Sequence, residues 1–153
     1  MTSPGVISAE DRFAIEDVLG RYLWAVDTGD LPGVLAVFEP DAVVRYAGGN
    51  RYQGEEGLKD FAVRAIGDAS AAGRMHLNRS LFAEAIRDTV LLRSYVIVPQ
   101  SSDGEEGVRI TAIRYTEDRL RKNRGGWRIY ERVIYAGPPP ALEHEHEQSA
   151  SST

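Results

Sequence analysis

The chain has no cysteine among its 153 residues and contains only three histidines. Without cysteine it can form no disulfide framework, no thiolate metal site and no thiol nucleophile, and a protein of a reducing cytoplasm needs none of these. No apolar run approaches the roughly 20 residues of a membrane span, and the first residues lack the basic start and apolar stretch of a secretory signal. We therefore expect a cytoplasmic protein that does not associate with membranes.

Positive charge is also scarce, because 18 lysines and arginines face 23 aspartates and glutamates, which gives a net charge of -5. Part of this excess comes from Glu143, Glu145 and Glu147, which lie in a C-terminal segment that has no basic residue. The rest of the chain is close to neutral and shows no basic stripe. This distribution argues against a nucleic-acid partner.

The C-terminal segment differs from the rest of the chain in composition. Three consecutive prolines at 138–140 cannot donate hydrogen bonds to a sheet, and the residues after them are polar. We expect a single domain over residues 1–136 and a disordered tail over 137–153. His144 and His146 lie in that acidic tail, where solvated side chains are more common than a metal site, and we expect neither a metal nor a cofactor.

Helical patterns dominate the first half of the chain. Ser8 can cap a long helix whose apolar residues recur at helical spacing up to Gly29, and Asp30 can cap a second helix that passes Phe38 and is closed by Pro40. A third helical pattern starts at Gly54, after a short β-branched run over 42–46.

Strand patterns dominate the second half. Four runs, at 75–86, 90–98, 108–122 and 127–135, are separated by short turns, so neighbouring strands should be antiparallel. Helices followed by a meander of strands indicate an α+β fold with the helices on one face of the sheet.

Several short motifs, taken together, resemble one family. They are Ala25 to Leu31 (AVDTGDL), Pro40-Asp41-Ala42, Gly54, Met75-His76, Asp118-Arg119-Leu120, Gly126 to Ile129 and Arg132. Their order and spacing over residues 8–135 resemble those of SnoaL-like proteins close to scytalone dehydratase, within the nuclear transport factor two-like superfamily. The resemblance implies a cone, in which a curved antiparallel sheet wraps an N-terminal helical hairpin and a third helix around an apolar pocket.

The same resemblance implies a catalytic pair formed by Asp27 and His76. An imidazole with an ordinary pKa of about 6.5 can accept a proton at neutral pH, and a carboxylate on its other nitrogen fixes the tautomer. The alternatives are a histidine that is part of the core and an aspartate that merely ends a helix in water. Alternation along the strand further predicts that Asn78 enters the pocket with His76, while Met75 and Leu77 pack against the opposite layer.

Tyr46 matches a tyrosine that holds the substrate oxygen in these relatives, and packing is its alternative role. The sequence departs from scytalone dehydratase at Val26, Gln100 and Thr116, which replace a tyrosine, a histidine and an asparagine, so scytalone is not the expected substrate. Tyr22 and Arg132 match a tyrosine and an arginine of bile-acid dehydratases, which the chain also resembles.

The remaining candidates for substrate binding are Trp24, Phe61, Gln100, Arg114 and Thr116. Arg114 alternates with Thr116 and Asp118 on one face of a strand. If this polar set faces the cavity, Arg114 can stabilise an enolate; if it faces water or another subunit, it is a surface ladder, which is the interpretation we favour from the sequence.

These observations predict a cofactor-independent lyase or isomerase of the dehydratase or cyclase type, acting on a small apolar or aromatic carbonyl compound. One alternative is a non-catalytic module like the β subunit of ring-hydroxylating dioxygenases, and another is an epoxide hydrolase. The resemblance also implies a homodimer through the open sheet face, where we expect polar and aromatic residues: Arg93, Arg109, Thr111, Arg128 and Tyr130.

Overall fold

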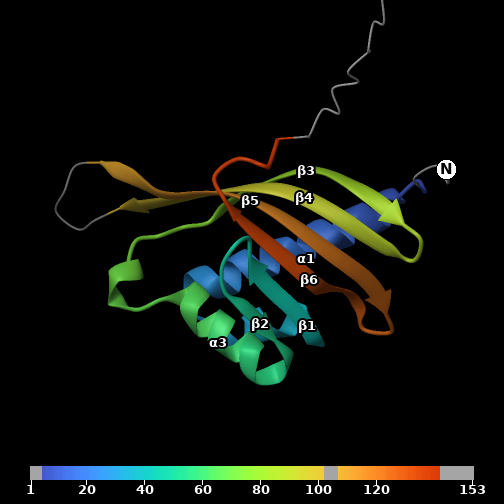
Figure 1. The fold of residues 1–153 in the computed structure, drawn as a ribbon, viewed down its shortest axis with the longest axis horizontal. Helices are drawn as coiled ribbons and strands as arrows, with labels where there is room; N and C mark the ends of the chain where they lie inside the picture. Colours follow the sequence, from blue (N-terminus) through green and yellow to red (C-terminus); the bar gives the residue numbers. More distant parts are fainter. Residues whose placement is uncertain (1–4, 102–106, 142–153) are drawn as a thin grey trace, which may run out of the picture.

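The computed structural model describes residues 5–101 and 107–141, which form three α-helices, one short 3-10 helix and six strands (Figure 1). In chain order these are α1 (Ala9–Thr28), α2 (Leu31–Ala36), β1 (Phe38–Tyr46), β2 (Arg51–Gln53), α3 (Gly54–Ile66), the 3-10 helix η1 (Ala69–Ala71), β3 (Leu77–Ile86), β4 (Thr89–Ser101), β5 (Val108–Asn123) and β6 (Gly126–Ala136). The strands form one sheet in the order β2-β1-β6-β5-β4-β3. All neighbouring strands are antiparallel except β1 and β6, which are parallel.

The predicted starts of the first two helices are confirmed by their caps. The Ser8 hydroxyl accepts a hydrogen bond from the backbone N–H of Asp11 at 3.0 Å, and the Asp30 carboxylate accepts one from the backbone N–H of Gly33 at 3.0 Å. Gly29 ends α1 in the left-handed conformation, with φ of 73°. These local signals were sufficient to place the starts of both helices and the end of the first.

The predicted end of the second helix was wrong. The helix stops at Ala36, and Phe38 begins β1, where it pairs with Ile129 of β6. Regular pairing then resumes at Val43, so Pro40 lies in an irregular stretch where its missing N–H removes no ladder hydrogen bond. The short strand β2 and the helix η1 were not predicted.

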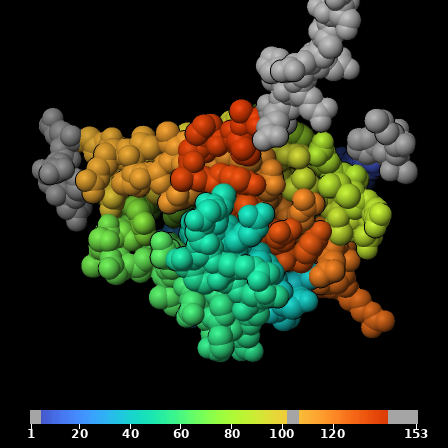
Figure 2. Space-filling view, in the orientation of Figure 1, coloured from blue at the N-terminus to red at the C-terminus, as the bar shows by residue number. Residues whose placement is uncertain are grey.

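The sheet curves over the helices, and the core lies between them (Figure 1). On the face shown in Figure 2, β5 and β6 cover the upper part, while α3 packs with β1 and β2 below. The core is built from side chains of both layers, with Ile15, Leu19, Val34, Leu92, Leu120 and Ile129 almost fully buried. The α+β cone predicted from the sequence is therefore confirmed.

The outer face of the sheet has no layer covering it within the described chain and carries apolar and aromatic side chains. Tyr95, Tyr115 and Tyr135 lie opposite one another on β4, β5 and β6, with ring centroids 6.3 and 5.3 Å apart. Ile97 and Ile113 pair beside them and are exposed. The polar interface predicted from the sequence is only partly on this face.

Two of the predicted interface residues lie elsewhere. The Arg109 guanidinium donates to the side-chain oxygen of Gln100 at 3.4 Å, and Arg128 lines a groove beside α1 and α2. The structure does not test the predictions that the C-terminal tail is disordered and that His144 and His146 hold no metal, because residues 142–153 lie outside the described residues. Within the described ranges, no helix is both long enough and apolar enough to span a membrane.

Candidate functional site

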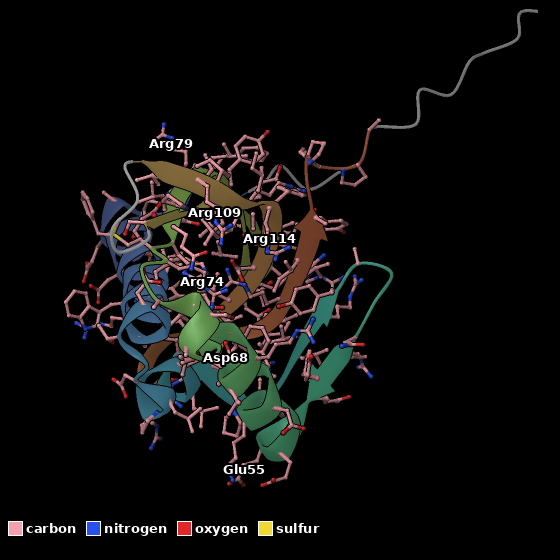
Figure 3. The ribbon with its side chains drawn as sticks, turned by 90° about the vertical axis from the view of Figure 1, so that its left-hand side faces the viewer. Glu55, Asp68, Arg74, Arg79, Arg109 and Arg114 are labelled. Atoms are coloured by element: carbon pink, nitrogen blue, oxygen red, sulfur yellow. The ribbon has the colours of Figure 1, made fainter. Side chains whose placement is uncertain are left out.

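A cavity of about 400 Å³ opens between the helices and the inner face of the sheet. Its wall is formed by α1, by α3 with the loop that follows it, and by inward-facing residues of β1, β4, β5 and β6. This volume is within the range of small-molecule sites in proteins. The cavity is therefore the candidate site. Figure 3 views the molecule from the side where Arg74, Arg109 and Arg114 lie between α1 and the sheet.

Asp27 and His76 form a two-point contact at this cavity. The Nδ1 atom of His76 lies 2.6 Å from the Asp27 Oδ1 atom, and the backbone N–H of His76 donates to Oδ2 at 3.0 Å. Because a carboxylate can only accept, Nδ1 carries the hydrogen, which leaves Nε2 of a neutral imidazole as the base. The two side chains are 19% and 23% exposed, so they are shielded without being sealed from solvent. The contact predicted between the two side chains is therefore present.

His76 reaches Asp27 from a loop rather than from the predicted strand. Strand β3 begins at Leu77, and the backbone N–H of Met75 donates to the Pro99 carbonyl at 3.1 Å, which fixes the segment before it. Met75 and Leu77 are exposed on the outer side, so the prediction that they pack against another layer was wrong. No second layer covers that side of the described chain.

The segment from η1 to His76 is held against β4 by the side chain of Gln100 and by a backbone hydrogen bond. The Gln100 amide donates to the carbonyls of Ser70 and Ala72, each at 2.8 Å, and the backbone N–H of Ser101 donates to the Gly73 carbonyl at 3.0 Å. Gly73 has φ of 78°, and a Cβ atom there would overlap the Ser101 carbonyl oxygen. Only glycine fits this close approach, which fixes the wall of the cavity beside His76.

The inner end of the cavity contains a buried ion pair across β5 and β6. The Arg132 Nε atom lies 3.5 Å from Oδ1 of Asp118, and the guanidinium stacks 4.2 Å from the centre of the Tyr22 ring. Burial raises the pKa of Asp118, and the charge of Arg132 acts in the opposite direction. Burial also raises the pKa of Tyr22, so its hydroxyl remains a neutral donor.

Most of the predicted site residues are brought together by the fold. Tyr22, Tyr46, Arg114, Thr116 and Arg132 all line the cavity that contains His76. The favoured interpretation of Arg114 and Thr116 as a surface ladder was therefore wrong, because this face of β5 is the inner one. Tertiary packing decided which of the two faces is covered.

Four predicted substrate-binding residues do not line the cavity. Trp24 is 71% exposed because it points away from the sheet, whereas Phe61 is 1% exposed within an aromatic core cluster. The Asn78 amide donates to Ser80 inside the cone, and Gln100 holds the loop described above. Phe61, Asn78 and Gln100 therefore support the fold around the site, whereas Trp24 lies on the outer side of α1.

Sequence reasoning missed two arginines of the cavity. Arg64 and Arg74 line it together with Asp68, and they come from the end of α3 and from the loop that follows. The feature of the sequence that could have identified Arg74 as a site residue is its position two residues before His76. The apolar lining expected from the sequence is present, at Leu23, Val96, Val98 and Ile134, but it forms only one part of a mixed wall.

Metal ligands do not gather in this region of the molecule. Among residues 5–101 and 107–141, no three His, Asp or Glu side chains come close enough together to hold a metal ion.

Solved structures with this architecture share the fold at low sequence identity. Aln2 from a Streptomyces species is 26% identical over 86% of this chain and 94% of its own, with a TM-score of 0.77. A candidate scytalone dehydratase from Novosphingobium aromaticivorans is 20% identical over 84% and 85% of the two chains, with a TM-score of 0.70. A ketosteroid isomerase-like protein from Erwinia carotovora atroseptica is 19% identical over 86% and 100%, with a TM-score of 0.65.

Comparison with curated proteins found no match. The family model described as a SnoaL-like domain matches residues 8–133, from the cap of α1 into β6. This range contains the helical hairpin, the Asp27–His76 pair and the strands that carry the arginines. The chain therefore belongs to the SnoaL-like family.

Proposed function

We propose that this protein is a lyase or isomerase that uses His76 as its general base and needs no cofactor. The observation that carries the proposal is the two-point contact of Asp27 with His76 at the edge of the cavity. This contact orients the imidazole and leaves Nε2 available to a bound molecule. Asp27 also stabilises the imidazolium that forms when the base takes a proton.

The proposed reaction begins with removal of a proton from carbon next to a carbonyl. His76 Nε2 takes the proton, and the electron pair of the C–H bond passes to the carbonyl oxygen as an enolate. The imidazolium can then return the proton to a hydroxyl on the next carbon, so that water leaves and a double bond forms. In a substrate that already carries a carbon–carbon double bond beside the carbon that lost the proton, the imidazolium can instead return the proton to the far carbon of that double bond, so that the double bond moves. Both outcomes leave the enzyme unchanged.

Tyr22 and Tyr46 are the groups we assign to the carbonyl oxygen. Both line the cavity, and Tyr22 stays protonated because its pKa is raised by burial. A neutral hydroxyl donates a hydrogen bond that strengthens as charge develops on the oxygen. This role is compatible with dehydration, cyclisation or isomerisation of a carbonyl-bearing metabolite such as a polyketide or a steroid-like compound.

The two alternative functions fit the cavity less well. Epoxide hydrolysis needs two carboxylates on either side of an arginine, whereas Arg132 is paired with Asp118 and its Nη1 atom has no hydrogen-bond partner. A purely structural module has no use for an oriented histidine in a cavity. The Asp27–His76 pair is therefore the feature that favours an enzyme.

Hydrogen–deuterium exchange tests the proposal without knowledge of the product. Cyclic ketones and thioesters, with and without a carboxylate, are incubated with the protein in D₂O and followed by NMR and mass spectrometry. We expect protein-dependent deuterium incorporation next to the carbonyl of at least one compound, and its loss in His76→Ala. Exchange that persists in His76→Ala would overturn the assignment of the base.

We also propose that the outer sheet face pairs two copies of the chain. Its apolar and aromatic surface is continuous across three strands, and a closed dimer would cover it. In light scattering at micromolar concentration we expect twice the monomer mass, and we expect Ile113→Lys to shift the protein to the monomer. Val63→Lys, at an exposed position on α3, is the matched control. A monomeric wild type would contradict this proposal.

A further inference from the structure

The cavity gathers positive charge although the protein as a whole is acidic. Four arginines line it, Arg64, Arg74, Arg114 and Arg132, and Asp68 is the one acidic residue of the same lining within the described part of the chain. Behind this lining, Asp118 pairs with Arg132 and Asp27 with His76, so the arginines still outnumber the carboxylates. The net charge of the chain is -5. A positive site in a negative protein is typical of a pocket that takes an anion.

Two of the lining side chains are buried without hydrogen-bond partners. Arg132 and Thr116 are each 2% exposed, and neither the Nε and Nη1 atoms of Arg132 nor the Oγ1 atom of Thr116 has a partner. The carboxylate of Asp118, whose two oxygens are also buried without a hydrogen-bond partner, lies 3.5 Å from Nε and does not engage Nη1. Buried polar groups that lack a partner are costly, and a ligand that brings acceptors to Nη1 and to the Thr116 hydroxyl removes that cost.

Arg74 and Arg114 extend this set along the cavity. Arg74 donates to the Ile66 carbonyl at 3.2 Å through Nη2, while its buried Nε has no hydrogen-bond partner. Arg114 comes from β5, two residues before Thr116, and so projects from the same face of the strand. The donors therefore come from the loop, from β5 and from β6, and they share one cavity with His76.

We infer that the natural ligand of this cavity is a carboxylate, whose two oxygens are held by Arg132 and Arg114 with the Thr116 hydroxyl. A guanidinium matches the two oxygens of a carboxylate in geometry as well as in charge. The apolar wall formed by Leu23, Val96, Val98 and Ile134 accommodates the carbon skeleton. The inference names the substrate class of the proposed enzyme. It rests on the proposed function only in taking the bound ligand to be the substrate, because binding of a carboxylate does not require catalysis.

A pair of probes that differ in charge and share a shape tests this inference. 2-Naphthoate and its neutral amide, 2-naphthamide, are titrated into the full-length protein by calorimetry. We expect 2-naphthoate to bind at least about tenfold more tightly, which is what a single hydrogen bond to a charged group contributes. We expect this preference to disappear in Arg114→Gln and to persist in Arg21→Gln, the same change at an exposed position of α1.

His76→Ala separates the two proposals because binding requires no turnover. We expect this variant to keep the preference for 2-naphthoate, so loss of exchange activity and loss of charge preference report on different residues. Equal affinity of the wild type for the two probes would overturn the inference. A preference that survives in Arg114→Gln would also overturn it, whereas 2-naphthyl phosphate binding more tightly than 2-naphthoate would replace the carboxylate with a phosphate.

Discussion

Replacing His76 with alanine is expected to lower kcat by about 10²–10⁴-fold, the contribution of a positioned general base. The fold should be retained, because the side chain is at the edge of the cavity and alanine keeps the backbone N–H that donates to Asp27 at 3.0 Å. The measurement is the rate of deuterium exchange into the responsive carbonyl compound, with circular dichroism as the check on folding. Substrate binding should change much less than kcat, since the base acts in the transition state.

Two further variants make this result specific. Asp27→Asn is expected to reduce kcat as well, because an amide has only one acceptor oxygen and cannot accept from both the imidazole Nδ1 and the backbone N–H of His76. Trp24→Ala, on the same helix but exposed on its outer side, should leave kcat unchanged. A folded His76→Ala protein with the kcat of the wild type would show that the histidine is a structural residue.

Phe61→Ala is expected to lower the free energy of unfolding by about 3–5 kcal/mol, the usual cost of removing a buried aromatic side chain. Phe61 is 1% exposed and contacts three other rings. Its ring centroid lies 6.5 Å from Tyr22, 6.0 Å from Phe38 and 5.8 Å from Tyr52. Because α1, β1, β2 and α3 meet at this cluster, a cavity there weakens the packing of both layers.

Urea denaturation measures this effect, with Val63→Ala on the exposed side of the same helix as the control. The control should change the free energy of unfolding by less than about 0.5 kcal/mol. If Phe61→Ala kept the stability of the wild type but lost ligand binding, the role in substrate binding that the sequence predicted would be restored.

The parts of the fold that depend on local chemistry could be predicted from the sequence. Ser8 and Asp30 cap the first two helices because a short polar side chain can accept from the free N–H groups of the next turn. The alternation of apolar and polar residues indicated the four long strands. The Asp27–His76 pair came from family resemblance, since no local pattern links two residues 49 positions apart.

Only the tertiary structure decided how these elements meet. Phe38 has the spacing of a helix residue, yet it becomes the start of β1 because β6 offers it a parallel partner in Ile129. Arg114 and Thr116 have an alternation that fits either face of a sheet, and it is the position of the helices that makes their face the inner one. The arginines of the cavity come from different elements, so their shared site arises from long-range packing that no segment of the sequence specifies alone.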